Sequence, residues 1–162
     1  MLIREATPDD WPAIWRFMQI IVAAGTTFSW DREIAEDAAR AAWMNAPPRR
    51  TLVAVNDDGA VIGTAEMGPN HGGPGSHVAT AGFMVDPAFA GRGAGRALAE
   101  HVLEQARGDG YRAIQFNAVV ETNDRAVRLW RSLGFRVLTT VPEGFRHPEH
   151  GYVGLHIMYR AL

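Results

Sequence analysis

The chain has 162 residues, of which 47% are hydrophobic and 21% are charged, and its formal net charge is −2. We therefore expect one globular domain over residues 1–162, with a single substantial core. This charge gives no electrostatic basis for nucleic-acid binding. The absence of cysteine excludes a disulfide framework, a thiolate metal site and a cysteine nucleophile. No apolar run reaches membrane-spanning length, and the first residues are typical of a strand rather than a signal peptide, so we expect a cytoplasmic protein.

The first part of the chain predicts a short strand over residues 1–6 and then a helix. Thr7-Pro8-Asp9-Asp10 is typical of a helix start, because threonine caps, proline fits the first turn and acids lie near the positive end of the helix dipole. The helix ends at Gly25 and is expected to bury six apolar side chains at helical spacing: Trp11, Ile14, Trp15, Met18, Ile21 and Val22. Asp31 is expected to cap a second, alanine-rich helix that ends near Asn45.

Residues 51–56 and 61–67 predict two strands, which Asp57-Asp58-Gly59-Ala60 joins as a hairpin. A loop rich in glycine and proline follows over residues 68–76, and residues 79–85 predict another strand. Asp86-Pro87 ends that strand, since proline has no N–H for the ladder and restricts the residue before it.

Three alternating glycines, Gly91, Gly93 and Gly95, lead from this strand into a helix with a broad apolar face. A glycine turn at a helix start leaves backbone N–H groups free at the positive end of the dipole. Arg92 and Arg96 add positive charge. The segment therefore predicts a site for a phosphate-bearing ligand.

Two common phosphate motifs do not fit this loop. A P-loop requires Lys-Ser/Thr after its last glycine, and here Arg96-Ala97 follows Gly95. A dinucleotide fingerprint requires a third glycine where the chain has Arg96. The segment instead resembles the acetyl-CoA pyrophosphate loop of the GNAT acetyltransferase superfamily, Arg/Gln-x-x-Gly-x-Gly/Ala after Val-x-Pro, at Val85, Pro87, Gly93 and Gly95. Ala90 departs from the Arg/Gln position, which leaves the backbone amides to hold the pyrophosphate.

A second block, from Asn123 to Phe135, resembles the superfamily pattern Asn-x-x-Ala-x-x-Leu-Tyr-x-x-x-Gly-Phe. Thr122 or Asn123 can cap a helix there, whose apolar face is Ala126, Leu129, Trp130 and Leu133. Gly134 is expected to end it in the left-handed region. Strands are predicted at residues 113–120, 135–141 and 152–160.

The resemblance implies a single-domain α/β fold, with a mixed, mostly antiparallel sheet of about six to seven strands, about four flanking helices and splayed central strands. It implies acetyl-CoA as cosubstrate and no metal. The pantetheine arm is expected to lie beside Phe83, Met84 and Val85 as an added strand. The remaining cofactor-binding residues are expected to be Gly91, Arg92, Gly93, Ala94, Gly95, Arg96, Asn117, Asn123, Ala126 and Trp130.

The activity implied is transfer of an acetyl group to a primary amine of a small molecule, amino acid or protein, by direct attack in a ternary complex. Many members carry a glutamate base on the strand before the glycine loop, where this chain has Thr80, Ala81 and Gly82. Glu66, on the adjacent strand, is our candidate base, and the alternative is a solvated strand-end carboxylate. The family's tyrosine acid aligns with Trp130, whose indole is too weak an acid to protonate a thiolate, so we expect Trp130 to pack.

His147 and His150, in the predicted loop between the last two strands, are alternative acid–base candidates, and surface exposure is the other interpretation. Phe28, Trp30 and Tyr152 are candidate acceptor contacts, and core packing is the alternative for the aromatic segment around Phe28.

Three classes of function remain compatible with the sequence. An N-acetyltransferase is favoured, and the overall form resembles the branch that includes phosphinothricin-type acetyltransferases. The alternative is a non-catalytic acyl-CoA-binding module, because the chain lacks the family's glutamate and tyrosine and has Ala90 at the Arg/Gln position. A nucleotide-binding protein is disfavoured by the absent Lys-Ser/Thr. The expected partner is an amine acceptor, with no nucleic acid or membrane, and a homodimer is left open.

Overall fold

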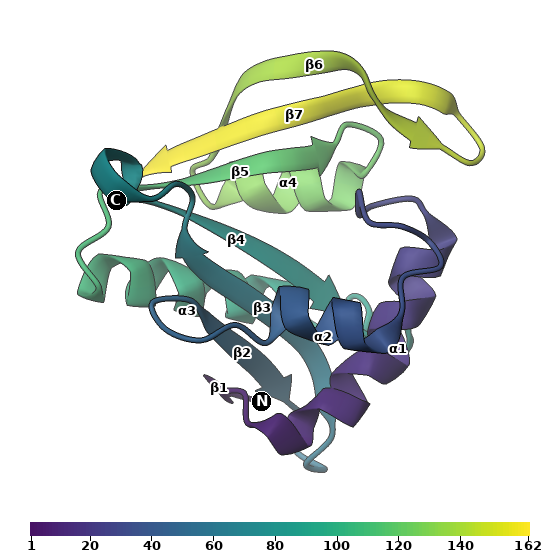
Figure 1. Ribbon diagram of the computed structural model, residues 1–162, viewed down its shortest axis with the longest axis vertical. Coiled ribbons are helices and arrows are strands. Elements are labelled where there is room, and N and C mark those ends of the chain that lie inside the picture. The colour runs from purple at the N-terminus through teal and green to yellow at the C-terminus, as the bar shows by residue number, and fades with distance from the viewer.

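The computed structural model describes residues 1–162 and contains one seven-stranded sheet with helices on both faces (Figure 1). The strands are β1 (Leu2–Glu5), β2 (Arg50–Val55), β3 (Val61–Pro69), β4 (Val78–Val85), β5 (Ala113–Val120), β6 (Arg136–His147) and β7 (Gly151–Ala161). The helices are α1 (Trp11–Ala24), α2 (Glu36–Trp43), α3 (Ala94–Gly108) and α4 (Asp124–Ser132). The strand order is β1-β2-β3-β4-β5-β7-β6, and every neighbouring pair is antiparallel except β4 and β5. The predicted mixed, mostly antiparallel α/β architecture is confirmed.

The sheet opens between its two parallel strands. β4 and β5 pair only at Val78 with Ala113 and at Ala79 with Ile114, and beyond these residues the strands diverge (Figure 1). The N–H of Asp86 donates to Ile62, and the carbonyl of Val78 accepts from Asn70, so the even-numbered backbone groups of β4 face β3. Because backbone groups alternate along a strand, those of residues 81, 83 and 85 face the gap. The predicted splay is therefore present.

Two separate cores lie on the two faces of the sheet, so the expectation of a single core was wrong. The larger packs α3 and α4 against the sheet around Leu98, Phe116 and Met158. The smaller packs α1 and α2 against the opposite face around Ile14, Phe17 and Trp43. Phe17 is a core residue that the predicted helical stripe omitted, whereas Trp15 and Ile21 are only partly buried. The helices hold the diverging strands from both sides.

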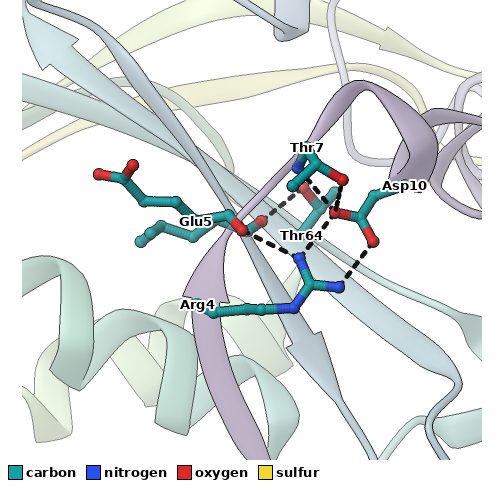
Figure 2. Close-up of polar contacts among 6 residues, drawn as sticks. Arg4, Glu5, Thr7, Asp10 and Thr64 are labelled. Atoms are coloured by element: carbon teal, nitrogen blue, oxygen red, sulfur yellow. Dashed lines mark hydrogen bonds and ion pairs between the residues drawn. The ribbon is translucent and has the colours of Figure 1, made fainter.

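The N-terminal strand is tied to the start of α1 by a carboxylate, as Figure 2 shows. The Arg4 guanidinium donates to both oxygens of Asp10, at 2.7 and 2.8 Å, and the Thr7 N–H donates to Asp10 at 2.7 Å. The Arg4 hydrogen bond, more than any other contact, lowers the pKa of Asp10 to about 2. The predicted helix start at Thr7 is confirmed as a 3-10 turn over Pro8–Asp10, which α1 follows directly.

Two predicted boundaries were wrong. Asp31 does not cap α2, which begins at Glu36. The carboxylate of Asp31 instead accepts the N–H of Glu33, and its backbone carbonyl accepts the N–H of Ile34, which closes a turn. The strand predicted over residues 135–141 continues to His147, because a bulge lets β6 resume its pairing with β7 after residues 142–144. Within the bulge Glu143 has a φ of 53°. His147 is therefore a strand residue, and only residues 148–150 separate β6 from β7.

Candidate functional site

A cleft of about 690 Å³ lies where β4 and β5 diverge. Its floor is formed by residues 80–85 of β4 and 116–120 of β5. Residues 26–30, which follow α1, line one side, and Asn123, Ala126 and Trp130 of the α4 region line the other. The cleft thus combines elements from both faces of the sheet, and it includes seven of the predicted cofactor-binding residues: Phe83, Met84, Val85, Asn117, Asn123, Ala126 and Trp130.

The glycine loop adjoins the cleft at Ala90 and ends in α3. Gly91 and Gly93 have φ values of 86° and 88°, which L residues rarely adopt. Gly93 is the N-cap of α3, and its carbonyl accepts the N–H of Ala97 at 3.0 Å, so the preceding N–H groups of the first turn have no intrahelical acceptor. A Cβ at Gly93 would meet nothing within 4 Å, so the loop faces open space. These features fit an anion.

Two arginines accompany these amides. The guanidinium of Arg92 lies 5.2 Å from the centre of the Phe89 ring. Arg125 of α4, which the sequence patterns did not single out, has its Nη2 atom 3.2 Å from the point where a Cβ at Gly91 would lie. Its position next to the glycine loop could not be predicted from sequence spacing, because Gly91 and Arg125 are distant in sequence and meet only in the fold. Arg96 instead donates to Ser132 at 2.8 Å and pairs with Glu100.

Trp130 belongs to an aromatic cluster under the cleft. Its ring centre lies 4.9 Å from that of Phe83 and 4.8 Å from that of Phe116, and Phe116 stacks on Phe135 at 4.3 Å. Trp130 is buried, with 7% of its surface exposed. This arrangement gives its indole a packing role against the strands that diverge.

Glu66 of β3 reaches the cleft on the face covered by α1 and α2. Its Oε2 accepts from Nη1 of Arg49 at 2.8 Å, and its side chain is 15% exposed. Burial raises the pKa of Glu66, and the charge and hydrogen bond of Arg49 oppose that shift. Glu66 is the only ionisable side chain among the residues that line the cleft. The geometry therefore places one enclosed carboxylate at this end, and Arg49 is a neighbour that sequence reasoning missed.

Phe28 and Trp30 form an aromatic wall of the cleft, and the Trp43 ring on which they pack lies close to Gly82, as Glu66 does. Each ring packs edge-on against the buried Trp43, with centres 6.0 and 5.9 Å away, and both also line the cleft. Trp43 is fixed by its indole N–H, which donates to Thr64 at 3.0 Å. The hydroxyl of Thr64 (Figure 2) in turn donates to the carbonyl of Leu52. The two interpretations of Phe28 and Trp30, acceptor wall and core packing, are both compatible with this arrangement.

The remaining candidates lie outside the cleft. His147 and His150 stack at 4.5 Å at the end of the β6–β7 hairpin, and Nδ1 of His147 accepts the N–H groups of Glu149 and His150. Tyr152 is 65% exposed. None of the three lines the cleft, because the extension of β6 carries them to the hairpin end. Their placement does not support a role at the thioester.

The structure contains no cluster of three or more His, Asp or Glu residues with the geometry of a metal site. Its helices are all too short or too polar to cross a bilayer.

A sheet opened between two parallel strands, with a glycine loop and its free N–H groups at one end and an enclosed carboxylate at the other, has the architecture of an acetyltransferase. The model of the acetyltransferase (GNAT) family matches residues 14–135, more than half of the chain, and the protein belongs to this family.

Individual relatives agree with this assignment. The structure of a GCN5-related N-acetyltransferase from Kribbella flavida is 56% identical in sequence, with a TM-score of 0.97 over 99% of this chain and 97% of that one. The structure of yncA from Salmonella typhimurium, a putative acetyltransferase with its cofactor acetyl-CoA, is 26% identical, with a TM-score of 0.83 over 100% of this chain and 94% of that one. N-acetyltransferase aca1 of Schizosaccharomyces pombe is 34% identical over 99 residues, which are 60% of this chain and 47% of that protein. The chain spans about half the length of the curated relatives it matches.

Proposed function

We propose that the protein transfers the acetyl group of acetyl-CoA to a primary amine by direct attack in a ternary complex. The observation that carries this proposal is the cleft between β4 and β5, which joins an anion-binding loop to one enclosed carboxylate. Membership of the GNAT family and the acetyl-CoA complex of the Salmonella relative support the choice of cosubstrate.

The residues present fit acetyl-CoA at two places. The free N–H groups at the start of α3, with Arg92 and Arg125 beside them, would hold the pyrophosphate. The backbone groups of Ala81, Phe83 and Val85, which have no strand partner, would bind the amides of the pantetheine arm. This refines one expectation: the backbone N–H and C=O of Met84 face β3, so Met84 can contribute only its side chain.

Glu66 is the residue we propose to accept the amine's proton. Acetyl-CoA supplies a thioester with a polarised carbonyl and a thiolate leaving group. An alkyl ammonium must lose one proton before its nitrogen can attack, and Glu66 passes that proton to solvent. As the N–C bond forms and the C–S bond breaks, the electron pair leaves with sulfur, and the second proton lost by nitrogen reaches the thiolate through water. Trp130 donates no proton in this scheme.

Thiol release from acetyl-CoA across a panel of primary amines tests the activity directly. We expect Glu66→Gln to lower kcat by about a hundredfold and to remove the acidic limb of the pH–rate profile, with little change in the affinity for acetyl-CoA. A variant that mainly raises the KM for the amine would instead assign Glu66 to cation binding. Acetyl-CoA binding without thiol release for any amine would favour the non-catalytic binding module.

The cofactor site is tested by a pair of variants at Gly93, where a side chain has room. Gly93→Asp places a negative charge at the pyrophosphate position, and we expect it to abolish acetyl-CoA binding. Gly93→Asn has nearly the same shape, tolerates a positive φ and carries no charge, so it should keep affinity within about tenfold. Calorimetry with acetyl-CoA measures both. Equal affinities for wild type and Gly93→Asp would refute this loop as the pyrophosphate site.

A further inference from the structure

The cleft carries one formal charge, and that charge is negative. All residues that line it apart from Glu66 are apolar or neutral, including Phe28, Trp30, Thr80 and Asn117. Glu66 is mostly buried, so a ligand charge placed near it interacts through a medium of low effective dielectric. The end of the cleft beside Glu66 therefore favours a cation over an anion, although the ion pair with Arg49 reduces this preference.

The nearest cation is not available to a ligand in the cleft. Arg49 donates through Nη1 to Glu66 at 2.8 Å and through Nη2 to the carbonyl of Pro69 at 3.3 Å. Arg49 is one third exposed, but it lines a neighbouring pocket of about 410 Å³ and does not line the cleft. No side chain in the cleft can thus neutralise a carboxylate that arrives with the amine.

The surface next to Glu66 is aromatic. A Cβ at Gly82 would lie 3.3 Å from Oε1 of Glu66 and 3.2 Å from the edge of Trp43. Phe28 and Trp30 pack on that same ring and are themselves open to the cleft. An apolar group bonded to an ammonium at Glu66 would therefore meet aromatic rings, and burying it against them favours binding.

We propose that the acceptor is a primary amine with a single positive charge and an apolar, aromatic-sized body, and without a carboxylate next to its amine. This inference rests on the proposed acetyl transfer and specifies its substrate class. The ammonium pairs with Glu66, and the body packs on Phe28 and Trp30. A carboxylate one carbon from the amine would lie beside Glu66 with no counter-charge, which costs binding free energy.

The test compares three ligands that share a phenyl body and an ammonium. They are 2-phenylethylamine, phenylalaninol and phenylalanine, and only the last carries a carboxylate. Calorimetry on the protein loaded with CoA measures binding without turnover. We expect the first two to bind within about threefold of each other and phenylalanine at least about tenfold more weakly. Phenylalanine binding as tightly as phenylalaninol would overturn the proposal.

Two variants separate the charge from the aromatic wall. Glu66→Gln should close the gap between phenylalaninol and phenylalanine to within about threefold, because the repulsion is removed. Trp30→Leu should weaken 2-phenylethylamine more than ethylamine, because only the former reaches the wall. A gap that survives Glu66→Gln, or equal losses in Trp30→Leu, would overturn the corresponding half of the proposal. Unchanged CoA affinity in both variants shows that they fold.

The outcomes also separate this inference from the proposed function. Thiol release with amino acids, together with tighter binding of phenylalanine, would refute the substrate class and leave acetyl transfer standing. The expected binding order without thiol release would refute acetyl transfer and leave the recognition of carboxylate-free amines standing. Failure of all three ligands to bind the CoA-loaded protein would overturn the substrate class.

Discussion

The carboxylate of Glu66 and the stem of Arg49 occupy space that two glycines leave open. A Cβ at Gly82 would make unusually tight contacts with Trp43 and Glu66, and one at Gly68 would collide with the stem of Arg49. Both glycines lie in strands where their φ angles are ordinary, so space and not backbone freedom explains them. Arg49 does not contact the cleft, and its effect on the reaction must pass through the position and acidity of Glu66.

Removing Arg49 should change the pH dependence of the reaction. Arg49 holds the pKa of Glu66 below the value that burial alone would give, so Arg49→Gln should raise it further. The base is active when deprotonated, and the acidic limb of the kcat/KM profile should therefore move to higher pH, with activity lost at neutral pH and recovered in alkali. Arg49→Lys keeps the charge and should keep the limb near its wild-type position.

Arg50→Gln is the matched control, because Arg50 pairs with Glu5 and Asp109 and not with Glu66. An acidic limb that stays in place in Arg49→Gln would contradict the coupling. An acidic limb that moves equally in Arg50→Gln would assign the shift to the net charge of the protein.

Substitutions at Trp130 should affect packing more than proton transfer. Trp130→Ala leaves a cavity among Phe83, Phe116 and Phe135 and should cost about 3–5 kcal/mol of stability. Trp130→Phe retains an aromatic ring and should keep most of the turnover. Steady-state kinetics and urea unfolding on the same samples measure both. A hundredfold loss of kcat in a folded Trp130→Phe variant with normal acetyl-CoA affinity would instead assign the indole a chemical role.

At the scale of elements, β1 and α1 are connected by a single ion-paired carboxylate. Asp10 is 9% exposed and accepts from Arg4 and from the backbone of Thr7, so one side chain fixes the direction in which α1 leaves the strand. Since α1 carries the loop with Phe28 and Trp30, this junction also sets one wall of the cleft.

The junction should weaken in acid. The folded-state pKa of Asp10, about 2, lies below its ordinary value of 3.8, so the paired carboxylate adds stability above pH 4 that is lost as the pH falls toward 2. The contribution is about 2 kcal/mol at neutral pH. Asp10→Asn should lose that amount at pH 7 and approach wild type near pH 2, as measured by urea unfolding across this range. Asp9→Asn, at an exposed neighbouring site, should lose less than about 1 kcal/mol at pH 7, because it removes only the interaction of Asp9 with the helix dipole.

Most elements could be predicted from local patterns, and the errors have local causes. The β2–β3 hairpin, the strand at residues 113–120 and the glycine at position 134 follow from turn chemistry and periodicity. The start of α2 could not be predicted, because Asp31 can cap a helix or close a turn with equal ease. The bulge in β6 was missed because proline and glycine, here Pro142 and Gly144, are typical of the end of a strand.

The candidate site was predicted only in part, because several of its contacts join residues that are distant in sequence. Glu66, Phe28 and Trp30, which line the cleft, were named as candidates because the family resemblance indicated which elements surround the acceptor. Arg49, Trp43 and Arg125 were missed because each acts across the fold, through contacts with residues distant in sequence. No spacing rule connects Arg49 to Glu66 before the β2–β3 register is known.

At the scale of the whole molecule, the sheet consists of two parts joined by two residue pairs between β4 and β5. Cofactor binding in this gap should protect backbone amides in an alternating pattern. The N–H groups of Ala81, Phe83 and Val85 face the gap and should exchange slowly with solvent deuterium only when CoA is bound. Those of Gly82 and Met84 face β3 and should already be protected in the free protein.

Amide exchange measured by NMR with and without CoA tests this pattern. Adenosine 3′,5′-bisphosphate, which lacks the pantetheine arm, is the matched ligand control and should leave these amides unchanged. Uniform protection of all five amides would indicate general rigidification in place of strand-like binding.

The bulge in β6 also limits how molecules of this protein can associate. An edge strand exposes unpaired N–H and C=O groups, which in many proteins invite pairing with a second copy and growth into fibrils. Here one edge is β6, where Pro142 lacks an N–H and Glu143, at a φ of 53°, bends the strand. The opposite edge, β1, has only four residues. Neither edge offers a long straight template, so the fold disfavours aggregation by sheet extension.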